Sequence, residues 1–350
     1  FVALVILQMA AEGKLNLDDP VVRYVPTFRT MSKSRSDRIT IDHLVTHRSG
    51  LTTLDGNSGN AEEPSLSGPA EAVAELAGVQ LFAQPGTTFQ YSNANYMLLS
   101  HLIEVLDNSP FEQVLKARIF EPLGMTNSFV RVSPSDAIPL ATGYRLWFGV
   151  PRPWQPEPES EPDRRMIGAG GALASLEDLA RYVEAVRTSD PRIVPQSADR
   201  LFVIKPFYEQ WGYGYGWYTD SAWDEPVFEH SGFTPGFFAL ATMVPEEGDV
   251  VVVLSNMSGL AHGDLPRAVT NAALGRDPVP AAASIGARMA IWSAVMAPLG
   301  LLMLLYKTGR RLSYSRQPMR LWVRALNVSA VVGLVAGASV VCSGFQTLRG

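Results

Sequence analysis

Residues 84–104 read QPGTTFQYSNANYMLLSHLIE and carry the clearest local structural signals in the chain. A Pro-Gly turn opens the stretch, and a short extended piece follows it. From about Asn93 to Leu106 apolar residues recur at helical spacing, which predicts a helix. The triplet Tyr91-Ser92-Asn93 then lies at the amino end of that helix, where the helix dipole favours negative charge. This position predicts a lowered pKa for the Tyr91 phenol.

Helices and strands are predicted on both sides of this stretch. The opening run Phe1–Ala11 has the apolar character of a core helix and ends near Gly13. It lacks the basic flank and cleavage site of a signal peptide. Short turns separate three late strand candidates, which favours an antiparallel meander. The other helix candidates are Thr40–His47, Phe111–Met125 and Ser175–Val186, and the strand candidates are Val227–Ser231, Phe237–Val244 and Val250–Ser255.

Composition excludes several classes of protein. With 350 residues and 47% hydrophobic residues, the chain is long enough for a large core. Cys342 is the single cysteine, so neither an intrachain disulfide nor a cysteine metal cluster can form. The net charge is −5, and residues 281–350 hold eight Lys/Arg and no Asp or Glu, which leaves the rest at 21 − 34 = −13. An acidic body gives no reason to expect nucleic acid as a partner.

The basic tail predicts a membrane segment. Met289–Tyr306 is an uncharged apolar run of 18 residues, and Ala325–Phe345 is a second run with Gly and Ala at helix-contact spacing. The intervening loop 307–324 holds six positive and no negative charges, which is typical of a cytoplasmic loop. This pattern predicts two transmembrane helices, with residues 1–285 outside the cytoplasm and the lipid bilayer as a partner. A pair of buried helices in a soluble domain is the alternative.

Several common catalytic motifs are missing from the sequence. It contains no G-x-S-x-G nucleophile elbow and no H-E-x-x-H zinc helix. His43 and His47 stand four apart, which is metal-ligand spacing on one helix, but without a third ligand we interpret both as structural. The glycines of WGYGYGWY (211–218) lack the Lys and Ser/Thr of a phosphate loop and indicate a close approach to a strand. We predict no cofactor and no metal.

A second triplet, His230-Ser231-Gly232, lies at the end of a predicted strand, before a glycine-bearing turn, where backbone amides can face a bound carbonyl. In this order, Y-x-N followed by H-S-G resembles the serine β-lactamase-like hydrolases, which comprise class C β-lactamases, D-Ala-D-Ala carboxypeptidases, D-aminopeptidases and related esterases. The resemblance covers nearly all of 1–275. The segments ITIDHLVTHRSGL, IFEPLGM, GAGGALASLEDLARY, YGYGW and EHSGFTPGF follow in the family's order.

The resemblance implies a fold and a domain division. The fold is of the α/β (α+β) type, with an antiparallel sheet flanked by helices and a mainly helical subdomain from about 40 to 170. A hydrolase domain spans 1–275, a linker 276–288, and two transmembrane helices 289–345.

The resemblance also implies site roles. Tyr91 transfers protons, and Asn93 holds the substrate amide. His230, Ser231 and Gly232 line the opposite wall, and the backbone N–H of Phe233 serves the oxyanion hole. Where β-lactamases usually carry Lys, this chain has His230, which is mostly neutral at pH 7 and argues against β-lactamase activity proper.

The family's nucleophile motif, Ser-x-x-Lys, is absent from the 350 residues. Each of the five lysines has another residue three positions earlier, and the only KTG, at Lys307, follows an apolar run. We therefore expect the serine and lysine to lie upstream of Phe1, so that this chain alone is an inactive fragment.

These observations predict a membrane-anchored, extracytoplasmic serine hydrolase that acts through an acyl-enzyme. Its substrate is a D-amino peptide of peptidoglycan type, an ester or a β-lactam. The alternatives are a binding or sensing module that uses the same fold without turnover, and a defective fragment of a disrupted gene.

Overall fold

The computed structural model describes residues 1–55, 68–130, 140–147, 150–154, 164–209, 211–220, 226–258, 264–277, 296, 298–304 and 306–307. The chain divides into two compact units. The first comprises Phe1–Ala141, Gln155–Thr234 and Ala239–Leu254, and the second comprises Thr142–Trp154, Pro235–Phe238 and Ser255–Gly350. Both sequence triplets belong to the first unit.

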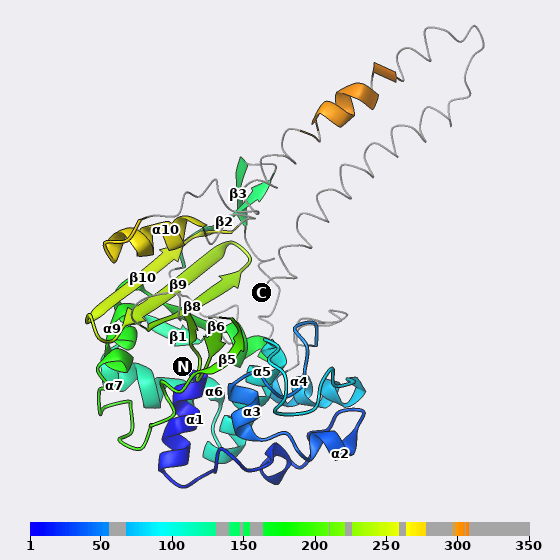
Figure 1. The fold of residues 1–350 in the computed structure, drawn as a ribbon, viewed down its shortest axis with the longest axis vertical. Coiled ribbons are helices and arrows are strands. Elements are labelled where there is room, and N and C mark those ends of the chain that lie inside the picture. Colours follow the sequence, from blue (N-terminus) through cyan, green and yellow to red (C-terminus); the bar gives the residue numbers. More distant parts are fainter. Residues whose placement is uncertain are drawn as a thin grey trace, which may run out of the picture. The chain divides into compact units, whose positions relative to one another are not determined.

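The helices of the first unit gather around α5, which contacts α1, α3, α4, α6 and α8. Figure 1 shows them in blue, cyan and green. Their bounds are α1 (Val2–Ala11), η1 (Val21–Arg23), α2 (Lys33–Ser36), α3 (Ile41–Val45), α4 (Pro69–Glu75), η2 (Leu76–Gly78), α5 (Asn93–Asp107), α6 (Phe111–Leu115), η3 (Lys116–Phe120), α7 (Glu121–Leu123), η4 (Arg164–Met166), α8 (Ile167–Gly170) and α9 (Leu176–Arg187).

Six strands form the main sheet in the order β10-β9-β8-β7-β6-β5, so that neighbours in sequence are neighbours in space. The pairs β5–β6, β6–β7 and β7–β8 are antiparallel. The predicted antiparallel sheet is confirmed. Its strands are β5 (Lys205–Tyr208), β6 (Trp211–Tyr213), β7 (Tyr218–Asp220), β8 (Val227–Thr234), β9 (Phe237–Val244) and β10 (Asp249–Ser255), and a separate pair joins β1 (Ser128–Val130) to β4 (Ala172–Ala174).

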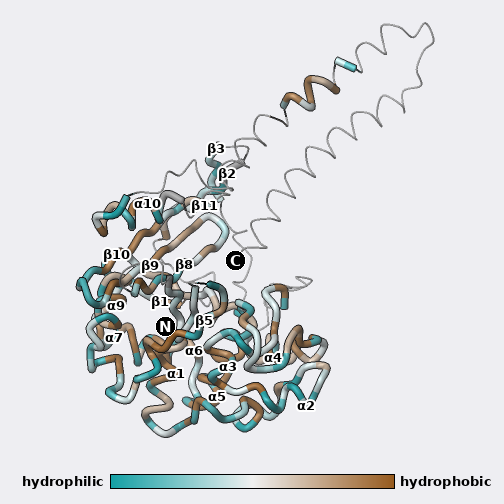
Figure 2. The backbone as a smooth tube through the Cα atoms, viewed as in Figure 1, coloured by the Kyte–Doolittle hydropathy of each residue, from teal (hydrophilic) through white to brown (hydrophobic). Residues whose placement is uncertain are grey.

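Helix α1 is a core element, as its composition predicts. Seven of its ten residues are buried, and hydrophobic colour covers most of its length in Figure 2. Gly13 follows with a positive φ of 73°, a backbone conformation that glycine adopts without steric cost and that stops the helix.

The predicted helix after Tyr91 is confirmed as α5. Ser92 has an extended backbone and is the N-cap, and Asn108 ends the helix in the left-handed conformation. The preceding turn requires glycine: Gly86 has φ +87°, and a Cβ there would lie 2.7 Å from Nε2 of His43. The Pro-Gly signal therefore reflects contact with a distant segment as well as local turn geometry.

Three element boundaries differ from the predictions. Helix 111–125 is interrupted by the π-helical η3 and ends at Gly124. Strand β8 continues to Thr234, so His230-Ser231-Gly232 lies inside the strand and not at its end. Helix α3 ends at Val45, which leaves His47 beyond the helix with φ +53°.

The second unit contains a three-stranded sheet and one further helix. Its strands lie in the order β11-β2-β3, where β2 is Gly143–Trp147, β3 is Val150–Trp154 and β11 is Met257–Ser258. The Ser258 hydroxyl accepts the Gly236 N–H at 2.8 Å, which joins the turn after β8 to this sheet. Helix α10 spans Asp264–Ala273.

The membrane prediction falls mostly outside the described residues. Span 325–345 lies entirely outside them, and of span 289–306 only residues 296, 298–304 and 306 are described. Among the described residues, no helix has both the length and the apolar character needed to cross a bilayer.

Candidate active site

The turn that carries Tyr91 is fixed by hydrogen bonds to residues 47–53. The Gln90 N–H donates to the His47 carbonyl at 2.9 Å, and the Thr53 hydroxyl donates to the Tyr91 carbonyl at 2.6 Å. The Ser92 N–H donates to Nδ1 of His47 at 3.2 Å. Three consecutive residues are thus held just before α5, which makes the Tyr91 side chain a fixed feature of the fold.

His230 is positioned by strand β8. The β7–β8 register runs from Asp220↔Val227 to Tyr218↔Glu229, so His230 is the first residue of β8 beyond the paired segment. Nε2 of His230 lies 3.4 Å from the Tyr213 hydroxyl. The strand therefore presents His230 and the residues after it at the place where cross-strand pairing to β7 has ended.

The structure brings the two triplets together. The ring centroids of Tyr91 and His230 lie 6.2 Å apart. Asn93 is the first residue of α5, and on β8 Ser231 and Gly232 are exposed while Phe233 is half-buried. Ser231 and Gly232 are therefore accessible on β8 immediately after His230, whose ring lies near the Tyr91 phenol.

Sequence reasoning missed the other rings that enclose this pair. The His47 ring lies 4.2 Å from the Tyr91 ring and 4.9 Å from the Tyr213 ring. Tyr218 lies 5.6 Å from His230. His47 was interpreted as merely structural, and the two tyrosines belong to the glycine-rich WGYGYGWY stretch.

The glycines of the WGYGYGWY stretch predict that its backbone lies close to a neighbouring segment. A Cβ on Gly212 would lie 2.3 Å from the Ile204 side chain, and one on Gly214 would lie 2.4 Å from the Val203 carbonyl. The predicted close approach is therefore confirmed. Alternation of these glycines with tyrosines indicates a strand that presses its backbone against a neighbour while its rings face the other way.

The predicted pKa of Tyr91 is wrong in direction. Burial among the surrounding rings raises the pKa of Tyr91 to about 12. Desolvation disfavours the phenolate more than the nearby helix terminus favours it. Near neutral pH, Tyr91 in this chain is a phenol and can donate a proton.

His230 is neutral at physiological pH. Burial lowers the pKa of His230 to about 4. With such a pKa the imidazole is uncharged near pH 7 and offers no cation to a ligand.

The histidine spacing forms no metal site in the structure. Because His47 lies past the end of α3, it does not share a helical face with His43. His43 instead accepts the Thr40 N–H on Nδ1 at 3.2 Å, in a capping arrangement. In the described part of the chain no group of three potential metal ligands occurs.

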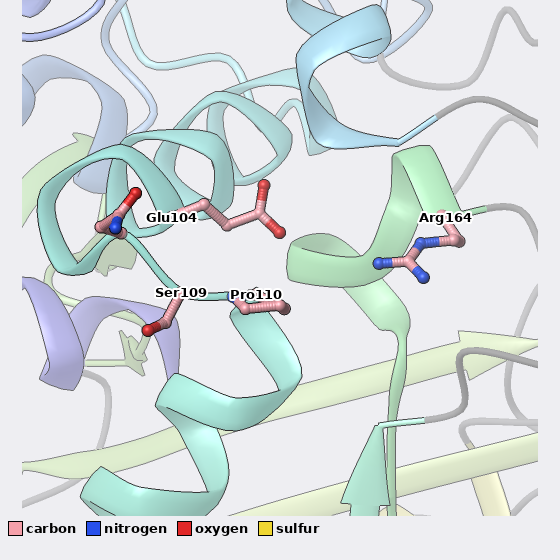
Figure 3. Close-up of a pocket in the computed structure, with 5 residues that line it drawn as sticks. Glu104, Ser109, Pro110 and Arg164 are labelled. Atoms are coloured by element: carbon pink, nitrogen blue, oxygen red, sulfur yellow. The ribbon is translucent and has the colours of Figure 1, made fainter.

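A surface depression lies at the other end of α5. Glu104 and Arg164 face each other across it, next to Ser109 and Pro110 (Figure 3). Tyr91 precedes the first residue of α5, and a 15-residue helix is about 22 Å long. This depression is therefore remote from the Tyr91–His230 pair and takes no part in the candidate site.

A family model described as Beta-lactamase matches residues 1–274. The chain belongs to the beta-lactamase family. Members of this family share an α/β fold and are serine hydrolases. The sequence resemblance is confirmed at this level.

The relatives include proteins of several kinds. Protein flp of Staphylococcus aureus (strain N315) is 28% identical over 263 residues, which is 74% of this chain and 51% of that protein. The chain thus spans about half the length of this curated relative.

Solved structures show the same fold. The octameric penicillin-binding protein homologue from Pyrococcus abyssi has a TM-score of 0.65 and 31% identity, and the match covers 79% of this chain and 64% of that one. A D-stereospecific amidohydrolase from Streptomyces sp. has a TM-score of 0.62 and 24% identity, over 73% of this chain and 79% of that one, which shows the fold alone.

Proposed function

We propose that this chain forms most of a serine hydrolase site that acts through an acyl-enzyme on a D-amino peptide, an ester or a β-lactam. The observation that carries the proposal is the approach of Tyr91 and His230, which are far apart in sequence and have ring centroids 6.2 Å apart. The 350 residues contain no Ser-x-x-Lys, so the proposal requires a serine and a lysine from outside them.

A lysine ammonium beside Tyr91 would lower the pKa of that phenol from its raised value.

The proposed roles follow from the chemistry of each group. A serine hydroxyl needs a base to become a nucleophile, and the lysine with Tyr91 would provide it. Tyr91 as a phenol would return the proton to the leaving group. Asn93 would hold the substrate amide. The Phe233 N–H would stabilise the oxyanion, and such a donor contributes about 3 kcal/mol.

The wall formed by His230, Ser231 and Gly232 of β8 favours one class of substrate over another. His230, with a pKa lowered to about 4, provides no cation for a substrate carboxylate near neutral pH. Neutral esters and peptide amides therefore suit this wall better than carboxylate-bearing β-lactams do.

Acylation of the full-length protein tests the proposal. A fluorescent penicillin and a fluorophosphonate should each form a covalent adduct, which mass spectrometry should locate on the serine of an upstream Ser-x-x-Lys. The present 350-residue chain is the matched control and should form none. Saturable, reversible penicillin binding by the full-length protein without any adduct would contradict the enzyme and favour the binding or sensing module.

We further propose that the C-terminal region anchors the protein in the cell membrane, with the hydrolase domain outside the cytoplasm. The support is the charge pattern, in which loop 307–324 carries six positive and no negative charges between two apolar runs.

Cysteine labelling in intact cells tests this topology. In a Cys342→Ser background, an impermeant thiol reagent should label Lys116→Cys, whose native side chain is 67% exposed, and should leave Ser313→Cys unlabelled. Labelling of Ser313→Cys alone would reverse the topology. Labelling of neither in intact cells but of both after lysis would place the whole chain inside and contradict the proposal.

A further inference from the structure

The His47 imidazole makes contacts that a buried structural histidine does not need. Its side chain is 1% exposed. Nδ1 accepts two N–H groups, from the Ser92 backbone at 3.2 Å and from Nδ2 of Asn95 at 2.9 Å. Ser92 is the residue between Tyr91 and Asn93, so one imidazole nitrogen holds the centre of the triplet.

The network behind His47 fixes its tautomer. The Ser49 hydroxyl donates to Oδ1 of Asn95 at 2.5 Å, which orients the amide so that Nδ2 faces His47. Because both groups bonded to Nδ1 are donors, Nδ1 carries no proton, and the neutral ring carries its proton on Nε2. Nε2 is buried and has no hydrogen-bond partner in the described part of the chain. Through Nδ1, His47 therefore holds both the Ser92 amide of the triplet and the Asn95 side chain of α5.

The ring of His47 also supports the Tyr91 side chain directly. The two rings are tilted by 34° with centroids 4.2 Å apart, and Tyr96 stacks on His47 at 5.0 Å. The His47 backbone is held at φ +53°, which a non-glycine residue adopts at some cost. The backbone carbonyl of the same residue, His47, accepts the N–H of Gln90, which immediately precedes Tyr91.

We propose that His47 is a positioning residue for proton transfer: its Nδ1 fixes the Ser92 amide and its ring fixes the orientation of the Tyr91 phenol. The effect on acylation rests on the proposed function, whereas the effect on the turn does not. His43 provides a contrast, because its Nδ1 also accepts a backbone N–H, from Thr40, but at the start of α3.

Two substitutions of His47 separate the contribution of the Nδ1 acceptor from the contribution of the ring's bulk. His47→Asn retains an acceptor near the position of Nδ1, and asparagine tolerates the left-handed backbone. His47→Gly tolerates the same backbone and has no acceptor. His43→Asn and His43→Gly form the matched control pair, since they respectively retain and remove an acceptor for the Thr40 N–H, which is not part of the triplet.

Two measurements are made on each variant. Hydrogen exchange of the 350-residue chain, followed by mass spectrometry of peptides covering residues 89–96, reports the Ser92 amide. The rate of acylation by a neutral activated ester, per folded molecule, is measured on the full-length protein. Thermal unfolding shows which variants fold.

The following results decide the proposal. His47→Gly should exchange the amide at least about tenfold faster and acylate about 10–100-fold more slowly, as misplacement of a reacting group predicts. His47→Asn should stay within about threefold of the parent in both measurements, and both His43 variants should acylate at the parent rate. Equal acylation by His47→Gly and an active parent would overturn the positioning role. A parent that never acylates would remove the proposed function, and unchanged exchange in His47→Gly would then also remove the role of His47 in the turn.

Discussion

The Tyr91 hydroxyl lies in an enclosure of rings, and its removal is the most direct test of the proposed proton transfer. Tyr91→Phe in the full-length protein should lower the acylation rate about 10²–10⁴-fold, the range for loss of a general acid–base group. Stability should change little, because only the hydroxyl is lost. Tyr24→Phe is the control, since its hydroxyl bonds to Asp19 at 2.6 Å and not to the site. Equal rates for Tyr91→Phe and the parent on every substrate would exclude Tyr91 from the mechanism.

His230 determines which substrates the wall of β8 can hold. His230→Lys would introduce a cation where burial now favours a neutral ring. We expect faster acylation by penicillins, whose carboxylate pairs with an ammonium, and no gain with a neutral ester. The measurement is the acylation rate with both substrates from pH 5 to pH 8. A gain of equal size with the ester would show that charge recognition is not the cause.

Two histidines with lowered pKa values, His47 and His230, also make stability depend on pH. Burial, with the His230 charge as the next cause, holds the pKa of His47 well below its usual range, and the pKa of His230 is lowered to about 4. An unfolded histidine has a pKa of about 6.5. Because the folded pKa values are lower, these groups contribute stability above about pH 6.5, and this contribution is lost as the pH falls towards 4.

Urea unfolding at several pH values tests this dependence. The free energy of unfolding should fall between pH 7 and pH 5, a range in which most carboxylates remain ionised. The double variant His47→Asn and His230→Asn should show a flatter profile across that range. A double variant with the same slope as the parent would assign the pH dependence to other groups.

At the scale of elements, the start of α9 depends on a buried aspartate. Ser175 caps the helix by accepting the Asp178 N–H, as its position predicts. The Asp178 carboxylate also bonds to residues outside this helix. It accepts the Asn127 N–H at 2.7 Å and the Ser128 hydroxyl at 3.0 Å, which connects α9 to β1.

Substitution of Asp178 should therefore lower the free energy of unfolding by more than the loss of a helix cap does. Asp178→Ala leaves two donors without a partner, and each buried unsatisfied donor costs about 1–3 kcal/mol. We expect a loss of about 2–4 kcal/mol in urea unfolding, whereas Glu177→Ala, an exposed neighbour in the first turn, should change stability by less than about 0.5 kcal/mol. A loss below about 1 kcal/mol for Asp178→Ala would assign it an ordinary capping role.

The sequence predicted the elements whose signals are local. Helices α1, α5 and α9 and strand β9 have continuous periodicity or clear caps, and they were found close to their observed bounds. The errors arose where distant contacts decide the structure. Extension of β8 to Thr234 and the π-helical turn of η3 have no local sequence signal.

The site was predictable to a similar extent. The order of Y-x-N and H-S-G pointed to Tyr91 and His230 before any geometry was known. The spacing of His43 and His47 suggested a shared helical face, and only the left-handed backbone of His47 shows that this is wrong. The raised pKa of Tyr91 depends on burial among rings from three separate segments, which no local pattern reveals.

At the scale of the whole first unit, Asp42 joins segments that are far apart in sequence. Its carboxylate lies in α3 and is 7% exposed. It accepts the Tyr215 hydroxyl at 2.6 Å, Arg200 at 3.3 Å and the Lys205 ammonium of β5. Arg200 in turn pairs with Asp18 at 3.0 Å. The α3 segment, which leads to His47, is thereby held against β5 and against Tyr215, two residues after Tyr213.

Loss of the Asp42 charge should destabilise the entire unit. Burial alone would raise the pKa of Asp42, but hydrogen bonds from Lys205 and Tyr215 outweigh it, so the folded pKa is lowered. Asp42→Asn leaves the Lys205 ammonium without its counter-ion, and because that side chain is 35% exposed, solvent screening should limit the loss to about 1–3 kcal/mol. Asp18→Asn is the matched control, because Asp18 shares Arg200 but is 68% exposed, and it should cost less than about 1 kcal/mol.

The pH dependence of this loss separates charge from packing. Since the folded pKa of Asp42 lies below the unfolded value, the carboxylate contributes its full stability above about pH 4, and this contribution falls as the pH drops through the folded pKa. The difference in unfolding free energy between the parent and Asp42→Asn should therefore be constant from pH 7 to pH 5 and shrink below pH 4. A difference that stays the same at pH 3 would show that Asp42 acts through shape and neutral hydrogen bonds, and that its charge does not hold the site segments together.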